Sequence, residues 1–276
     1  MISRPGSKGS TMKFCSIASG SSGNCIFAGS AGTSVLIDAG LSGKKIDAGL
    51  RTIDMTTTDI DGILVTHEHS DHVKGLGVLA RRYSIPIYAT EGTIRAITEN
   101  AAIGKIPSGI LHTVCADRPF MLGDIEISPF SISHDAAEPV GYRLEHNGKT
   151  CAVATDMGCY DEYTVDHLRN LDVLLLESNH DVHMLEAGRY PYYLKRRILS
   201  EKGHLSNETA GQLLCRVLHE GISRIYLGHL SHENNYEDLA FATVCDEVTM
   251  GDNPWCSGDF RISIAHRDVP GEAVVF

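Results

Sequence analysis

Residues 62–72 of this 276-residue chain read GILVTHEHSDH. The first five residues are an apolar run typical of a buried strand. The next six contain three histidines and an aspartate, side chains that bind transition metals. Because side chains two apart in an extended backbone project the same way, His67 and His69 can bind one cation while Asp71 and His72 turn toward a second. A polar loop with solvated histidines is the alternative, but the position after a buried strand favours a metal site.

Two cations need more ligands than one loop provides, and three further candidates follow predicted strands. His134 comes after IEISPFSIS, Asp156 after CAVAT and His229 after RIYLG. A residue at a strand end is held by the sheet, while the loop lets its side chain face a cleft. Taken singly, each also fits a hydrogen-bonded core or surface group. Because the two oxygens of a carboxylate can each serve one metal, Asp156 is the predicted bridge.

The predicted ligands fall into two sets that share the bridging carboxylate. The first site consists of His67, His69, His134 and Asp156. The second consists of Asp71, His72, Asp156 and His229. Imidazole and carboxylate ligands suit Zn, Mn and Fe alike, so the ligand set predicts two divalent ions without choosing the metal.

The composition is that of an ordinary folded chain, with 42% apolar and 21% charged residues, which excludes disorder, collagen and coiled coil. No segment approaches the ~20 apolar residues that cross a bilayer, and the N-terminus lacks the layout of a secretion signal. We therefore expect a cytoplasmic protein without a membrane partner. The eight cysteines form no CxxC pair, so neither a disulfide framework nor a thiolate zinc site is indicated. The net charge of −11 repels a phosphate backbone, so a nucleic-acid partner requires a local basic patch.

The order of predicted elements indicates an α/β fold. Residues 1–11 are small, polar and without periodicity, so we expect a disordered leader or cloning remnant before a single domain at 12–276. Strands are predicted at 12–18, 24–29, 33–39, 62–66, 110–114, 125–130, 141–144, 151–155, 173–177, 224–227 and 262–265. Helices are predicted at 73–83, 93–99, 192–199, 206–218 and 236–248, with Ser206 as a helix N-cap. Two runs of strands, each followed by helices, predict a four-layer αββα sandwich.

The motif HxHxDH, followed in order by a histidine, an aspartate and a histidine, resembles the metallo-β-lactamase-fold hydrolases over nearly the whole ordered chain. The resemblance implies that Asp38 in VLIDAG supports the histidine loop. HxH rather than HxE points away from the oxygen-reducing diiron members, and Asp156 in place of cysteine points away from antibiotic hydrolysis. The β-CASP insertion of the larger nucleases would follow Asp156, but the stretch before His229 is too short to hold it.

Four further segments resemble the YycJ/WalJ family: SIASGSSGNC (16–25), ESNHDVHML (177–185), YPYYLKRRILSEKGHLSN (190–207) and LGHLSHENN (227–235). His232 departs from the lysine that this pattern leads us to expect. The resemblance implies a 5′-to-3′ exonuclease on DNA, linked to mismatch repair, with Zn or Mn as the metals and Fe as a further candidate. Two cations about 3.5 to 4 Å apart lower the pKa of a bridging water toward ~7, so the expected nucleophile is a metal-bridged hydroxide that attacks the phosphodiester.

Two segments are predicted to contact the substrate. In the turn at 19–24, Ser21, Ser22 and Asn24 can donate to phosphate oxygens, although an ordinary hairpin turn fits as well. Residues 189–202 contain five basic residues and one glutamate, interleaved with three tyrosines. Basic groups neutralise phosphates and aromatic rings stack on unpaired bases, which favours a single strand or a frayed 5′ end. The contacts predicted there are Arg189, Tyr193, Lys195 and Arg196; a solvated helix with core tyrosines is the alternative.

The catalytic prediction is less specific than the ligand prediction. Asp71 can bind metal and orient the attacking water, and either His204 or His180 can protonate the leaving oxygen, although a capping role fits both histidines equally well. A small-molecule hydrolase, glyoxalase II-like or acting on a cyclic phosphodiester, is the second functional hypothesis. A metal-stabilised protein that only binds nucleic-acid ends is the third, disfavoured because structural zinc sites are usually closed. Digestion polarity and oligomeric state are left open.

Overall fold

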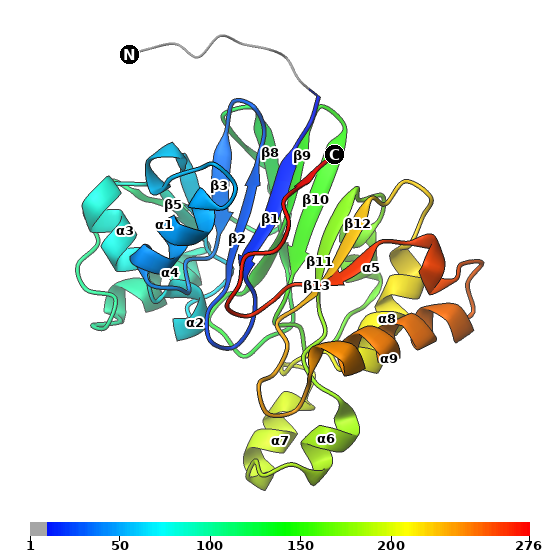
Figure 1. The fold of residues 1–276 in the computed structure, drawn as a ribbon. Coiled ribbons are helices and arrows are strands. Elements are labelled where there is room, and N and C mark those ends of the chain that lie inside the picture. The colour runs from blue at the N-terminus through cyan, green and yellow to red at the C-terminus, as the bar shows by residue number, and fades with distance from the viewer. Residues whose placement is uncertain (1–9) are drawn as a thin grey trace.

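The computed structural model describes residues 10–276, which form two β-sheets packed face to face with helices on both outer sides (Figure 1). Except for the last strand, the first half of the chain builds the first sheet and the second half builds the other. This is the αββα arrangement predicted from the two runs of strands, and the prediction is confirmed.

The first sheet combines an antiparallel and a parallel part. Its strands are, in spatial order, β14 (Val274–Val275), β1 (Lys13–Ala18), β2 (Cys25–Gly29), β3 (Ser34–Ile37), β4 (Gly62–Leu64), β5 (Ile87–Ala89) and β6 (Leu111–Thr113). The strands from β3 to β6 are parallel, and β1 pairs antiparallel with β2 and β14. Every residue of β2, β3 and β4 is buried, as expected for strands covered on both faces.

The second sheet repeats this division. Its strands are, in spatial order, β13 (Ile262–Ile264), β12 (Arg224–Gly228), β11 (Val173–Glu177), β10 (Lys149–Ala154), β9 (Val140–His146), β8 (Ile125–Ser131) and β7 (Phe120–Leu122). The strands from β10 to β13 are parallel, and those from β7 to β10 are antiparallel. The central strand β11 is buried along its whole length and ends in a carboxylate, Glu177.

Helices cover the outer face of each sheet. The first sheet carries α1 (Gly43–Arg51), α2 (Ser70–Val73), α3 (Leu76–Tyr83) and α4 (Glu91–Glu99). The second carries α5 (Glu162–Leu168), α8 (Asn207–Val217) and α9 (Glu237–Met250). The remaining pair, α6 (Val182–Ala187) and α7 (Tyr192–Ile198), projects from one end of the sandwich (Figure 1). One apolar cluster lies between the sheets and one lies under each helical layer.

Most predicted elements form within a few residues of the expected bounds. The predicted N-cap of α8 is confirmed, because the Ser206 side chain accepts a hydrogen bond from the Thr209 backbone N–H. The predicted helix at 73–83 divides into α2 and α3. The helices α1, α5 and α6 and the short strands β5, β7 and β14 were not predicted. Between Asp156 and His229 the described chain forms elements of the sandwich and the α6–α7 pair, with no inserted domain.

The structure bears only in part on two expectations for the whole chain, the disordered leader and the lack of a membrane-spanning segment. The leader predicted at 1–11 falls mainly on residues 1–9, outside the described residues; Ser10 and Thr11 are exposed and Met12 is buried. Within residues 10–276, no helix combines the length and the apolar character needed to span a membrane.

Candidate metal centre

The candidate ligands follow strands that end at one edge of the sandwich. His67 lies shortly after β4, Asp156 after β10 and His229 after β12. His134 follows β8, which runs in the same direction as β10 because both are antiparallel to β9. The carboxyl ends of parallel strands meet at one edge of a sheet, which is where binding sites form in α/β folds.

The seven predicted ligands converge in overlapping groups. The ligand atoms within each group lie within 4.8 Å of one another, and three groups consist of predicted ligands alone: His67, His69 and His134; His67, His72 and Asp156; and Asp71, His72 and His229. A fourth group adds Glu177 and His204 to Asp156 and His229. Asp156 lies between the first and the third of these groups. Its Oδ1 is 3.8 Å from Nε2 of His134 and 3.4 Å from Nε2 of His229, and its Oδ2 is 3.3 Å from Nε2 of His72. The arrangement suits the binding of divalent metal, with Asp156 in contact with histidines of both predicted ligand sets.

Four of the five candidate histidines have a polar group beside Nδ1, which leaves Nε2 to face the other ligands. Nδ1 of His67 lies 3.0 Å from the Thr66 hydroxyl, and Nδ1 of His72 lies 2.7 Å from Asp38. Nδ1 of His134 lies 3.0 Å from the Gly203 carbonyl, and Nδ1 of His229 lies 3.0 Å from Glu177. Such contacts fix the ring orientation of metal-binding histidines. Asp38 also accepts hydrogen bonds from the backbone and the hydroxyl of Thr66, both at 2.9 Å, so it supports the loop as the family resemblance implies.

Three residues of the centre have unusual backbone conformations. Asp38, Asp156 and His229 have φ values of 63°, 62° and 56°, although none is glycine. Each follows a parallel strand. The left-handed region costs a non-glycine residue about 1–2 kcal/mol, and such residues cluster at functional sites. Each of these residues turns the chain at the end of its strand, and its side chain contacts a candidate ligand there.

The residues present fit divalent cations. Nε2 of His67 is buried without a hydrogen-bond partner, and such a nitrogen is costly unless something else binds it. Burial would lower the pKa of His72, but Asp156 and Asp38 raise it well above its usual value. Burial is likewise outweighed at His229, where Asp156 and a hydrogen bond to Asp71 raise the pKa to about 10. The carboxylates thus favour positive charge, which a cation would supply.

A cleft of about 200 Å³ opens at the centre. It is lined by Ser21, His69, Asp71, Asp156, Asn179, Tyr190, Leu194, Arg197, Ile198, His204, His229 and Ser231. Of the two predicted proton donors, His204 therefore reaches the cleft. His180 is only 1% exposed, and neither of its ring nitrogens has a hydrogen-bond partner.

Glu177 joins the centre, although the sequence predicts no role for it in the site and only places it at the end of a strand and the start of segment 177–185. It is fully buried, and its Oε1 lies 2.8 Å from Nδ1 of His204 and 3.0 Å from Nδ1 of His229. Its Oε2 accepts hydrogen bonds from the backbone of Met157 and Leu205. Burial would raise the pKa of Glu177, but the two histidines lower it well below its usual value, so the group stays ionised. An acidic residue ending an apolar strand, VLLLE, was the available signal.

The serine-rich turn divides between two environments. Ser21 and Ser22 are exposed, and Ser21 lines the cleft. Asn24 is instead buried, with its Nδ2 3.0 Å from Nε2 of His72 and 3.5 Å from Oδ2 of Asp71. Its Oδ1 accepts a hydrogen bond from the Gly20 backbone. Asn24 therefore contacts the candidate ligands from within the protein.

The basic segment at 189–202 also has side chains in different environments. Lys195 donates hydrogen bonds to the carbonyls of Glu186 and Gly188, both at 2.7 Å, and so ties α7 to the end of α6. Arg196 lies over the ring of Tyr192, and both Arg189 and Tyr193 are exposed on the projection. Among the described residues of the segment, the arginine that lines the cleft is Arg197, which is not among the four predicted contacts.

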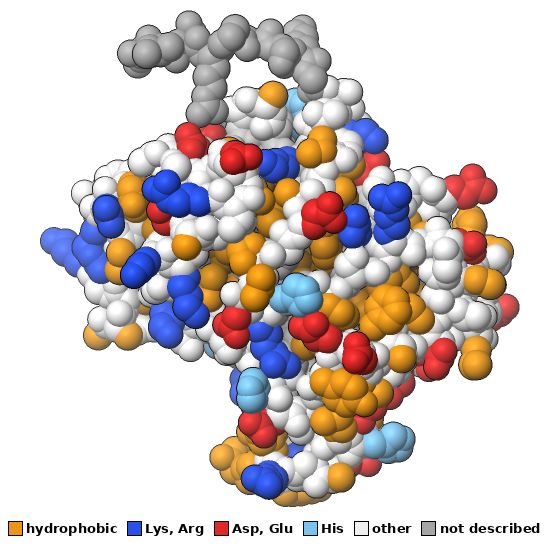
Figure 2. Space-filling model, in the orientation of Figure 1, with side chains coloured by type: hydrophobic (Ala, Val, Ile, Leu, Met, Phe, Trp, Pro, Cys, Tyr) orange, Lys and Arg blue, Asp and Glu red, His pale blue; other side chains and the backbone are white. Residues whose placement is uncertain are grey.

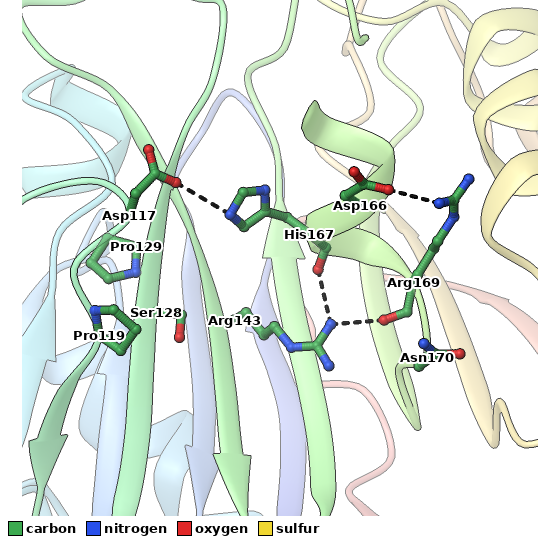
Figure 3. A pocket seen from close by; sticks show the side chains of 9 residues that line it. All are labelled: Asp117, Pro119, Ser128, Pro129, Arg143, Asp166, His167, Arg169 and Asn170. Carbon is green, nitrogen blue, oxygen red and sulfur yellow. Dashed lines mark hydrogen bonds and ion pairs between the residues drawn. The ribbon is translucent and has the colours of Figure 1, made fainter. Parts of the chain in front are cut away.

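A second cavity, of about 360 Å³, lies beside α5 and strands β8 and β9 (Figure 3). Its polar side chains mostly contact one another and the backbone. Arg143 donates hydrogen bonds to the carbonyls of His167 and Arg169, and Nε2 of His167 lies 3.4 Å from Asp117 (Figure 3). None of the nine lining side chains has a buried polar atom without a partner. The cavity is larger than the cleft but contains none of the candidate ligands.

Comparisons with known proteins agree with the fold. A family described as "Beta-lactamase superfamily domain" matches residues 33–230. The chain is 42% identical over 240 residues to exodeoxyribonuclease WalJ of Streptococcus pneumoniae, covering 87% of this chain and 89% of that protein. It is 43% identical over 233 residues to exodeoxyribonuclease YycJ of Bacillus anthracis, covering 84% and 88%.

Solved structures share the fold at low sequence identity. The metallo-β-lactamase fold protein YhfI of Bacillus subtilis aligns with a TM-score of 0.71 at 17% identity, covering 97% of this chain and all of that one. Zn²⁺-bound PqqB of Methylobacterium extorquens aligns with a TM-score of 0.69 at 16% identity, covering 94% and 99%. On the sequence matches, the chain belongs to the β-lactamase superfamily, within the family of the proteins WalJ and YycJ.

Proposed function

We propose that the chain is a metal-dependent exodeoxyribonuclease in which seven side chains hold two divalent cations, Zn or Mn. The observation that carries the proposal is the convergence of the predicted ligands in overlapping groups around Asp156. The names of the two relatives, both exodeoxyribonucleases, support DNA as the substrate. We also propose that the chain acts in the cytoplasm.

The cations, when bound, would supply a water of lowered pKa and polarise the phosphoryl group. Asp71 orients the attacking water, because its carboxylate lines the cleft and lies 3.5 Å from Nε2 of both His72 and His229. His204 delivers a proton to the leaving oxygen. Since Glu177 contacts its Nδ1, Nε2 of His204 is the atom left for that transfer. Its position in the cleft favours His204 over the buried His180.

The substrate proposed is a single strand or a frayed 5′ end that crosses the α6–α7 projection. Basic and hydrophobic side chains lie together on this projection, at the bottom of the view in Figure 2. Tyr192 and Tyr193 are each 75% exposed, which suits them to stack on unpaired bases. Arg189 and Arg196 supply exposed positive charge there, and the exposed Ser21 and Ser22 would bind a phosphate from the turn at 19–24. The bonded amine of Lys195 supports a structural role for that residue instead.

The test is a nuclease assay with Mn²⁺ or Zn²⁺ on 5′- and 3′-labelled oligonucleotides, single-stranded and duplex. We expect mononucleotides to be released from the 5′ end, and His67→Ala and Asp156→Asn to abolish the release. His167→Ala, which removes a histidine of the second cavity, should retain full activity. Intact oligonucleotides at every metal concentration would refute the proposal.

A small-molecule hydrolase is the second candidate, and the modest volume of the cleft, about 200 Å³, favours it. Its substrate would be a thioester or a cyclic phosphodiester. Turnover of a glutathione thioester faster than of any oligonucleotide would decide for this alternative.

A further inference from the structure

One face of α7 forms a wall of the cleft. Leu194, Arg197 and Ile198 line it, and these residues are spaced i, i+3 and i+4 along the helix. Residues with this spacing lie on the same side of a helix. Lys195 and Arg196 therefore project in other directions, in agreement with their contacts to the end of α6 and to Tyr192. Helix geometry thus selects Arg197 from the basic segment.

Arg197 is the one lysine or arginine among the twelve described residues that line the cleft. Its side chain is 49% exposed, so solvent and substrate can reach it. The other charged residues with fixed sign in the lining are the carboxylates Asp71 and Asp156. A guanidinium binds phosphate through two N–H groups at once, which gives both charge and geometry.

Asp135 holds this guanidinium from one side. Nε of Arg197 donates to Oδ2 of Asp135, and Nη2 donates to Oδ1 at 3.0 Å. Asp135 directly follows His134, and its backbone N–H donates to the Lys202 carbonyl, which ties this loop to the chain just after α7. The bidentate pair occupies the Nε–Nη2 edge of the planar fork and leaves the Nη1–Nη2 edge for a second anion.

We propose that Arg197, oriented by Asp135, binds a non-bridging phosphate oxygen of the DNA strand in the cleft. The proposal rests on the proposed function and adds its phosphate contact. Asp135 acts as a positioning residue, because it fixes the plane of the guanidinium without touching the substrate. Arg197 lies on the projecting α6–α7 pair, so the contact would also tie the strand to the wall of the cleft.

The experiment measures kcat and KM of the metal-loaded enzyme on a single-stranded oligonucleotide at several KCl concentrations. Arg197→Ala should raise KM about tenfold or more, since it removes a charge-assisted hydrogen bond. The slope of log KM against log[KCl] should become shallower by about 0.7, the share of one phosphate contact on a single strand. Arg197→Lys should keep the slope, because the charge remains, but recover KM only in part, because an ammonium lacks the fork.

Arg216→Ala is the matched control. Arg216 lies on α8, is 44% exposed in its side chain and pairs with Glu162, so its removal deletes the same charge and a similar ion pair outside the cleft. It should leave KM and the salt slope unchanged. Equal effects of the two alanine variants, or an unchanged KM in Arg197→Ala, would overturn the phosphate contact while leaving the nuclease function intact. A wild-type enzyme that degrades no DNA would overturn both.

Discussion

Asp38 is outside the ligand set but controls the orientation of part of it. Its carboxylate contacts Nδ1 of His72 and receives two hydrogen bonds from Thr66, the residue before His67. It is 2% exposed, so these contacts are made in a region of low dielectric, where they are strong.

Asp38→Asn keeps the size of the side chain and tolerates the left-handed backbone, but it removes the charge that supports His72. We expect metal affinity to fall about 10- to 100-fold, the usual effect of losing such a supporting group. A competition titration against a fluorescent chelator measures it. Asp61→Asn, an exposed aspartate that accepts a hydrogen bond from the Ser34 backbone, is the control. Equal affinities in the two variants would show that Asp38 does not orient the centre.

His180 makes stability depend on pH. Burial lowers the pKa of its imidazole to about 4, against the opposing charge of Glu177. The unfolded chain takes up this proton near pH 6.5, so the contribution is fully present above 6.5 and is lost as the pH falls toward 4. Its full size is about 3 kcal/mol. In urea unfolding from pH 7 to 4, His180→Gln should lose less stability than wild type; parallel curves would contradict the prediction.

At the scale of elements, the approach of the β3–α1 loop to α2 depends on Gly40. A Cβ on Gly40 would overlap the Asp71 carbonyl oxygen, which already accepts a hydrogen bond from the Asn24 backbone at 2.7 Å. The Gly40 N–H donates to the Asn24 carbonyl at 2.8 Å. The β3–α1 loop, the serine-rich turn at 19–24 and the start of α2 therefore meet at Gly40.

Gly40→Ala should push α2 and Asp71 away from the centre. We expect a lower melting temperature and weaker metal binding, measured by thermal unfolding with and without Mn²⁺. Gly258→Ala is the control, because a Cβ there would have no neighbour within 4 Å and the backbone is not left-handed. Wild-type metal binding in Gly40→Ala would be inconsistent with this close packing.

Sequence patterns predict the elements that contain long apolar runs. They do not predict elements that are too short, or have too few apolar residues, to show a period. Strand β11 and the ligand motif after β4 were predictable because burial and ligand spacing are local properties. Strand β5 has three residues, too few for a period. Helix α1 contains two buried large apolar residues, Ile46 and Leu50, so its amphipathic pattern is sparse, although Ser42 provides an N-cap.

The candidate site shows the same limit. The order of histidines and aspartates along the chain indicated which residues converge, but not which groups contact them. Asn24 lies against His72 because the turn packs on the helix of the ligand loop, a contact across 48 residues. Arg197 could have been selected from its neighbours by its helical spacing to Leu194, whereas its pairing with Asp135 follows from tertiary structure alone.

At the scale of the whole molecule, the proposed cations would join the two sheets. The ligand loop at 67–72 follows β4 of the first sheet, and His134, Asp156 and His229 follow strands of the second. Metal bound only by the folded chain stabilises it by RT ln(1 + [M]/Kd), about 2.7 kcal/mol at 100 times Kd. The melting temperature should therefore rise with Mn²⁺ or Zn²⁺ and fall on chelation. Metal-free and metal-loaded samples with the same melting temperature would contradict the expected coupling.

The most direct test of the dinuclear centre is the metal content per chain, measured by mass spectrometry after loading and desalting, for wild type and Asp156→Ala. Because Asp156 belongs to both predicted ligand sets, we expect two ions per wild-type chain and at most one in the variant. Fewer than two ions in the loaded wild type, or two in Asp156→Ala, would contradict a centre built around a shared carboxylate.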